Sequence, residues 1–251
     1  RNGAGLNPFA TAHIIERAAA LRKLGIIGGM SWVSTATYYD RINRIVQKRA
    51  APMASAPLLI ESLDFSTLRA IQDDSGWDHA ADVLSESARR LVDAGAGALV
   101  ICANSMHKVY DRVADAAGVP VLHIADCVGR EMQAAGIKSA ALVGTRNVMT
   151  ESFYRRRLVS HGVDLVPPDM EQVEVIDRII YDELMRGKAT REAERTMKTW
   201  ITLKERAGAE AIVLACTELS MIVDVDANVL PIFDSTRAHC RAAVEWLISD
   251  Q

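Results

Sequence analysis

Short apolar runs alternate along the chain with longer segments whose apolar residues recur at helical spacing. The run KLGIIGG, from Lys23, ends in glycines and is followed by a polar stretch and then by the helical pattern YYDRINRIVQKR. Further apolar runs of this kind in the first half are PLLIESLDF, GALVICANS and VPVLHIA. Buried strands that alternate with amphipathic helices are typical of parallel sheets covered by helices. We therefore predict an α/β protein.

The second half of the chain repeats the first. KLGIIGGMSWVSTATYYDRI matches SAALVGTRNVMTESFYRRRL, GAGALVICANS matches GAEAIVLACTE, and VPVLHIADCVGREM matches LPIFDSTRAHCRAA. Subtracting residue numbers puts the partners about 110 to 116 positions apart, in the same order. Any chain of alternating strands and helices produces some such echoes, but motifs at nearly one offset favour a duplication. We predict two pseudosymmetric lobes, each a parallel sheet flanked by helices, with the active site in the cleft between them.

The crossings between the lobes are expected near Pro120 and Pro231, because the residue before a proline favours extended backbone. The first lobe is then 22–119 together with 233–251, and the second is 120–232. A hinge at this pair would let the cleft close and exclude water. Residues 1–21 lack the ordered charged, apolar and small-residue regions of a signal peptide, and we interpret them as an N-terminal extension or tag.

Ligands of open parallel sheets lie beyond the carboxyl ends of the strands. Backbone N–H groups collect there and suit a carboxylate, so a small anionic metabolite is the expected ligand. The candidate substrate-binding residues that follow an apolar run are Met30, Ser31, Asn104, Ser105, Thr145, Thr217 and Glu218.

Composition excludes several other classes of function. The net charge of -3, with no basic cluster interleaved with aromatic residues, argues against a nucleic-acid partner. No apolar stretch reaches the ~20 residues that span a bilayer, so no membrane role is expected. The four cysteines lack CxxC or Cys/His spacing, which predicts neither a zinc site nor a disulfide framework but reduced thiols in a cytoplasmic protein. The nucleotide motifs GxGxxG and GxxxxGK[ST] are absent as well, so we expect no metal and no cofactor.

Cys216 is the strongest candidate for a catalytic residue. It stands between an apolar run and a helical pattern, where a helix dipole would stabilise a thiolate that acts as nucleophile or base. The alternative is a buried cysteine that serves as a small apolar residue. Thr217 would cap the helix or bind a carboxylate, and Glu218 would hold the thiol proton or complement the dipole.

The other half of the predicted cleft supplies His107 and Lys108. His107 is a candidate acid-base group that follows Asn104 within one helical turn, although a hydrogen bond to nearby backbone is an equal alternative. Lys108 would neutralise a distal carboxylate or else lie exposed.

These motifs closely resemble the aspartate/glutamate racemase family, the amino-acid racemases that need no pyridoxal phosphate. The resemblance runs from about Lys23 to the C-terminus and rests on KLGIIGGMSWVSTATYYDRIN, CANSMHK, LVGTRNVMTESFYRRRL, VPPDMEQVEVIDRIIYDEL, LACTELSMIV and LPIFDST. It implies two lobes that close over an amino acid, a cysteine from each lobe on either side of the α-carbon, and a homodimer. The carboxylate donors that it implies are Ser31, Asn104, Ser105 and Thr217, with nearby backbone N–H groups.

The sequence departs from that family pattern at Ala103, which occupies the place of the usual first cysteine and carries no proton to donate. Cys102 is its neighbour, but successive strand residues point to opposite faces, so we expect Cys102 to face the core. Three interpretations remain open. The chain is a racemase of aspartate, glutamate or a related amino acid with Cys216 as the surviving base and His107, Cys102 or water at the other face. It is instead a single-cysteine lyase or decarboxylase of the same superfamily, or a non-catalytic binder of small acids.

Glu61 is a further candidate substrate-binding residue, at the end of the run PLLIESLDF. A carboxylate in the cleft wall would repel an acidic side chain and attract an ammonium group, which would broaden specificity beyond aspartate or shift it away from aspartate. The alternative is an exposed charge at the end of a strand.

Overall fold

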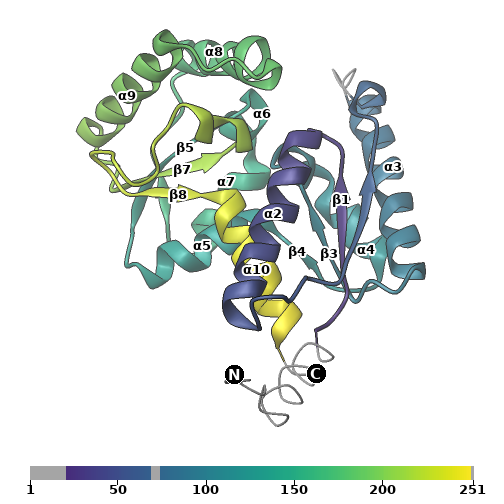
Figure 1. The fold of residues 1–251 in the computed structure, drawn as a ribbon. Helices are drawn as coiled ribbons and strands as arrows, with labels where there is room; N and C mark the ends of the chain where they lie inside the picture. The colour runs from purple at the N-terminus through teal and green to yellow at the C-terminus, as the bar shows by residue number, and fades with distance from the viewer. Residues whose placement is uncertain (1–20, 69–73, 250–251) are drawn as a thin grey trace, which may run out of the picture.

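The computed structural model describes residues 21–68 and 74–249 and shows two α/β lobes (Figure 1). Each lobe contains a four-stranded sheet, with strand order β2-β1-β3-β4 in the first and β6-β5-β7-β8 in the second. All paired strands are parallel. The predicted pseudosymmetric pair of parallel sheets is confirmed, because each sheet has the same order of strands in the same chain direction. The strands are β1 (Leu24–Gly28), β2 (Leu58–Ser62), β3 (Ala98–Ile101), β4 (Val121–Leu122), β5 (Ser139–Gly144), β6 (Asp164–Leu165), β7 (Ala211–Ala215) and β8 (Ile232–Asp234).

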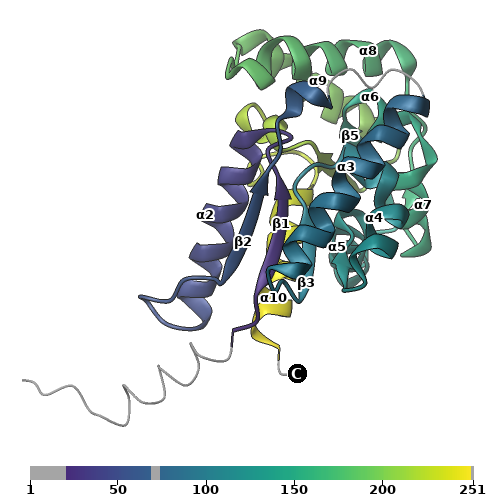
Figure 2. The same ribbon diagram turned by 90° about the vertical axis from the view of Figure 1, so that its right-hand side faces the viewer.

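Helices cover both faces of each sheet, which explains why the central strands are apolar throughout. In the first lobe, α2 and α10 pack on one face, and α3 and α4 pack on the other (Figure 2). In the second lobe, α5 and α7 pack on one face, and α8 and α9 on the other. The helices are α2 (Trp32–Arg49), α3 (Asp74–Asp93), α4 (Tyr110–Ala117), α5 (Ile124–Ala134), α6 (Arg146–Thr150), α7 (Ser152–Ser160), α8 (Met170–Arg178), α9 (Arg191–Arg206) and α10 (Ser235–Ile248).

The chain crosses between the lobes a few residues later than the prolines suggest. Val121–Leu122 pairs with β3 of the first sheet, and Ile232–Asp234 pairs with β7 of the second. A strand stays with the sheet that satisfies its hydrogen bonds, so the predicted boundaries at 119/120 and 232/233 move to the ends of β4 and β8. At the crossings, His123 directly after β4 and Asp234 at the end of β8 cap α5 and α10 with their side chains.

Helix α10 joins the two lobes. It begins directly after β8 of the second sheet and packs beside α2 and α5 (Figure 1). Its buried residues Cys240, Val244 and Leu247 belong to the core of the first lobe. The predicted extension at 1–21 lies outside the described residues except for Leu21.

The turn after β1 sets the close approach of two segments at the edge of the first sheet. Gly29 has φ of +84°, and an added Cβ would lie 2.0 Å from the carbonyl oxygen of Leu63. Its N–H donates to Thr35 Oγ1 at 2.8 Å. Only glycine fits this approach at this φ, and the turn delivers Met30 and Ser31 to the carboxyl end of the sheet.

Candidate active site

A small cavity lies where the carboxyl ends of β1 and β3 meet those of β5 and β7, with about 50 Å³ of space for water-sized molecules. That space is smaller than an amino acid, so binding of one requires the lobes to part or side chains to move. The predicted residues around it are Met30, Ser31, Cys102, Ala103, Asn104, Ser105, Thr145, Cys216, Thr217 and Glu218. Strand ends of both lobes therefore lie at one cavity, because the parallel strands of a sheet carry their carboxyl ends to the same edge of that sheet.

Cys216 follows β7 and points its sulfur at a carboxylate. Its Sγ lies 3.2 Å from Glu218 Oε2, and Ser34 Oγ of helix α2 donates to Glu218 Oε1 at 3.2 Å. Burial raises the pKa of the Cys216 thiol well above its usual value, and the neighbouring Glu218 carboxylate raises it further. The surroundings of Cys216 therefore favour the neutral thiol, and the helix dipole expected to stabilise a thiolate is outweighed. The following helix is a 3-10 segment, η5 (Thr217–Met221), and its backbone N–H groups lower the pKa too little to offset burial.

Ala103 lies opposite, at the end of β3, and brings a methyl group to the cavity. The side chain of Cys102 packs in the buried core with Tyr38 and Cys240, on the α2 and α10 face of the sheet. Burial raises the pKa of the Cys102 thiol well above its usual value. The alternation of strand side chains therefore gives the first lobe a thiol that faces the core, as expected.

His107 does not line the cavity. It is buried, its Nδ1 donates to the carbonyl oxygen of Ala103 at 2.9 Å, and its Nε2 accepts from the Ile124 N–H at 3.2 Å. Burial lowers the pKa of His107 to about 4. His107 is thus in the alternative state expected from the sequence, with both ring nitrogens hydrogen-bonded to backbone, and it ties the wall of the cavity to the crossing after β4.

Lys108 and Glu61 also lie outside the cavity. Lys108 Nζ lies 2.8 Å from Glu151 and over the ring of Trp77, 4.5 Å from its centroid. Glu61 accepts from Ser87 Oγ at 2.8 Å and forms an ion pair with Arg90 of α3. These interactions lower the pKa of Glu61, although desolvation alone would raise it. Neither charge lines the cavity here, because Lys108 pairs with Glu151 across the lobes and Glu61 pairs with Arg90 within its own lobe.

Two buried polar atoms at the cavity lack a hydrogen-bond partner among the described residues. They are Asn104 Oδ1 and Thr145 Oγ1. A buried polar atom without a partner is costly, so a ligand that supplies a donor to Asn104 and an acceptor to Thr145 would be favoured. The ammonium and carboxylate groups of an amino acid supply both.

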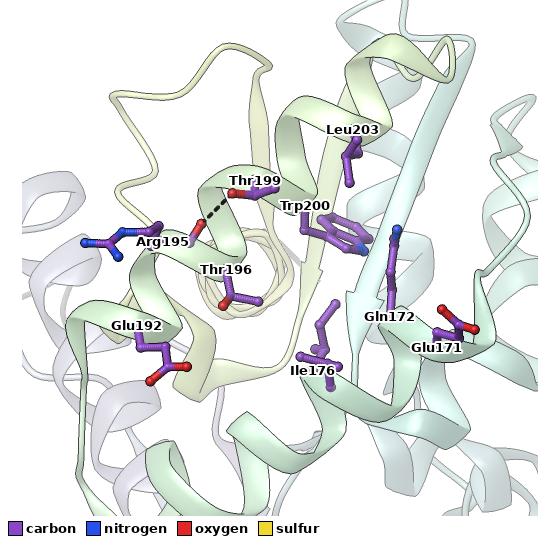
Figure 3. Close-up of a pocket in the computed structure, with 10 residues that line it drawn as sticks. Glu171, Gln172, Ile176, Glu192, Arg195, Thr196, Thr199, Trp200 and Leu203 are labelled. Carbon is purple, nitrogen blue, oxygen red and sulfur yellow. Dashed lines mark hydrogen bonds between the residues drawn. The ribbon is translucent and has the colours of Figure 1, made fainter.

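A larger groove of about 510 Å³ lies between α8 and α9, away from the strand ends (Figure 3). Trp200 and Ile176 form its floor, and Thr196, Thr199 and Leu203 line the α9 side. It contains no thiol or histidine among its lining residues, so the smaller cavity is the better candidate for chemistry. In residues 21–68 and 74–249, no three His, Cys, Asp or Glu side chains are grouped to hold a metal ion, and no helix there is long and apolar enough to cross a membrane.

Comparison with known proteins agrees with this geometry. Residues 27–243 match the family described as Asp/Glu/Hydantoin racemase. The chain belongs to this family. Members named as amino-acid racemases are isomerases, and the family places this chain among the isomerases.

Three similar proteins illustrate the family. RacX of Bacillus subtilis, a broad specificity amino-acid racemase, is 24% identical over 234 residues, which are 91% of this chain and 99% of RacX. A candidate Asp/Glu racemase from Yersinia pestis is 37% identical, with a TM-score of 0.86 over 91% of this chain and 100% of that one. An aspartate racemase homologue from Pyrococcus horikoshii is 31% identical, with a TM-score of 0.80 over the same shares.

Several residues that line the cavity were not identified from the sequence. Ser34 lies one helical turn after Ser31 on α2, and this spacing is the one signal that could have identified it. Other residues come from short helical segments rather than strand ends, and no strand-end pattern points to them. They are Phe65, Ile180, Tyr181 and Met185.

Proposed function

We propose that this chain is a cofactor-independent amino-acid racemase in which Cys216 removes the α-proton. The observation that carries the proposal is the contact of 3.2 Å between Cys216 and Glu218 inside a cavity bounded by both lobes. Of the four cysteines, Cys216 alone is partly exposed. A thiol beside a carboxylate and open to a ligand is suited to proton transfer rather than to packing.

Burial and the Glu218 carboxylate raise the pKa of the Cys216 thiol, so ionisation must precede catalysis. Glu218 accepts the thiol proton, and the Cys216 thiolate then takes the α-proton, re-forming the S–H bond as the α-carbon's electron pair moves into the substrate carboxylate. Donors around the carboxylate stabilise the charge that develops there. The candidate donors are Ser31, Ser105, Thr145 and Thr217. Asn104 Oδ1 is placed to accept from the ammonium group.

The opposite face of the α-carbon needs a different proton source. Ala103 has no proton to give, both nitrogens of His107 hold backbone, and the thiol of Cys102 faces the core. Water fits the small cavity. In this scheme a water protonates the second face, and the resulting hydroxide takes the proton from Glu218. This step re-forms water and leaves Cys216 as a thiol and Glu218 as a carboxylate, the starting state.

The methyl group of Ala103 favours a second candidate function. A decarboxylase breaks a carbon–carbon bond to release carbon dioxide and needs one proton delivered to one face of the resulting enediolate. One thiol suffices for that step, and Cys216 supplies it.

Exchange in D2O tests the first function against the second. Both enantiomers of aspartate, glutamate and several neutral amino acids are incubated with the protein, loss of the α-proton is followed by NMR, and handedness is followed by chiral chromatography. We expect exchange with inversion, reduced at least ~1,000-fold in Cys216→Ala. Cys127→Ala, which alters a buried cysteine outside the cavity, should keep the rate.

Exchange with retention would show that Cys216 serves one face alone. If no α-proton exchanges while substituted malonates release carbon dioxide, the decarboxylase replaces the racemase. If amino acids bind without either reaction, the chain is a binder of small acids.

A further inference from the structure

One wall of the cavity is built by large uncharged side chains from both lobes, and they are apolar except for the hydroxyl of Tyr181. Phe65 comes from the first lobe, in the short 3-10 helix η1 (Phe65–Thr67). Ile180, Tyr181 and Met185 come from the second lobe. We call these four residues the apolar wall. The polar groups that suit an ammonium and a carboxylate, on Asn104 and Thr145, lie elsewhere around the cavity, so the apolar wall is left for the substrate side chain.

The second-lobe part of this wall is held in an ordered segment. It follows α8 as a π-helix, η3 (Ile179–Glu183), and a 3-10 turn, η4 (Leu184–Arg186). π-helical turns cost stability and occur frequently at functional sites. Glu183 Oε2 accepts from Thr190 Oγ1 at 2.7 Å, and its carbonyl oxygen accepts from the Lys188 N–H at 3.0 Å. The turn η4 packs against η5, the segment that carries Glu218. The second-lobe part of the apolar wall is therefore held against the segment that carries Glu218.

The charge around the cavity is negative. Glu218 is its one charged side chain among the described lining residues, and none of these is a lysine or an arginine. The nearest predicted cation, Lys108, is held by Glu151 and lies outside the lining. A substrate carboxylate directed toward the apolar wall would lose water and gain no cation, beside a carboxylate that repels it. An apolar side chain would instead bury its surface against that wall.

We infer that this site selects amino acids with neutral, apolar side chains and disfavours aspartate and glutamate. The inference rests on the proposed function for the reaction, but the preference itself is a property of binding. It replaces the argument from Glu61, because the paired Glu61 carboxylate does not reach the cavity.

Binding is the first test. Isothermal titration of the intact protein with each enantiomer of leucine, methionine, aspartate and glutamate should show the acidic amino acids binding at least tenfold more weakly. Equal or tighter binding of aspartate or glutamate would overturn the inference. If neutral amino acids bind more tightly but no α-proton exchanges, the proposed racemase function fails and the inferred preference stands. If α-protons exchange fastest with aspartate, the racemase function stands and the inferred preference fails.

A charge variant tests the wall itself. Tyr181 is 39% exposed, so Tyr181→Lys adds a cation to the apolar wall without burying it. We expect this variant to bind aspartate at least fivefold more tightly, and Tyr181→Gln, the matched neutral variant, to show no such gain. Met185→Lys introduces the cation from the neighbouring turn and gives a second readout. Failure of both lysine variants to improve aspartate binding relative to Tyr181→Gln, with circular dichroism unchanged, would overturn the assignment of this wall.

Discussion

Replacing Glu218 by Gln should make the Cys216 thiol easier to ionise and the enzyme slower. At the Sγ to Oε2 distance of 3.2 Å, two unit charges repel by about 1.3 kcal/mol at the dielectric constant of water and by about 5 kcal/mol at an effective value of 20. A difference of about 1.4 kcal/mol corresponds to a factor of ten. Glu218→Gln should therefore raise the thiolate fraction at neutral pH by about tenfold or more.

The assay is the pH dependence of alkylation of Cys216 by iodoacetamide, located by mass spectrometry. The thiolate is the reacting species, so the midpoint should move to lower pH in Glu218→Gln. Cys102, Cys127 and Cys240 are buried and serve as internal references in the same digest. Racemisation should fall in this variant, because the carboxylate that accepts the thiol proton is gone.

Ser34→Ala is the matched control, since it removes the hydroxyl that donates to the other carboxylate oxygen and leaves the charge in place. Its alkylation midpoint should move much less than that of Glu218→Gln. An unchanged or higher midpoint in Glu218→Gln would refute the electrostatic argument and leave burial as the sole cause of the raised pKa. A rate that rises together with the thiolate fraction would refute the role of Glu218 as proton acceptor.

The remaining predictions concern the opposite wall, the turn after β1 and the buried histidines. Ala103→Cys should speed inversion at least ~10-fold by giving the second face a proton donor, measured by chiral chromatography. Gly29→Ala should lower the free energy of unfolding by more than ~2 kcal/mol in urea, because its φ of +84° is costly for alanine and its Cβ would lie 2.0 Å from Leu63 O. Burial lowers the pKa of His107 to about 4 and of His239 to about 3. The unfolded chain thus binds protons first below pH ~6.5, and stability should fall progressively from there to pH ~3, by roughly 3 kcal/mol for His107 alone; constant stability from pH 7 to 4 in urea unfolding would contradict this.

The duplicated architecture could be predicted because it is encoded locally. Apolar runs recur at one offset and each proves to be a strand, and the carboxyl ends of β1, β3, β5 and β7 reach the cavity. The same signal identified Cys216 and Ala103 as opposing residues. It required only that parallel strands end at one edge of a sheet.

The sequence pattern could not predict the contacts of side chains whose partners are distant in sequence. Glu61 pairs with Arg90, a residue of α3, and the strand pattern of an edge strand does not say which helix residue lies beside it. His107 meets Ile124 only because the chain crosses between lobes there. Tyr181 and Met185 reach the cavity from a π-helix and a 3-10 turn. No periodicity of apolar residues in the sequence predicts these two turns.

The two lobes repeat a fold but divide the chemistry unequally. The aligned motifs place Ala103 opposite Cys216 and Ser105 opposite Glu218, so the first lobe lacks both the thiol and the neighbouring carboxylate. A thiol placed at 103 would therefore have its ionisation opposed by burial, without the added repulsion that acts on Cys216. Its proton would be lost more easily than that of Cys216, so it would be the stronger acid and the better proton donor to the second face. In the present site, Cys216 carries a thiol with a raised pKa and Ala103 carries only a methyl group. This difference favours protonation from the Cys216 side and implies unequal rates for the two enantiomers.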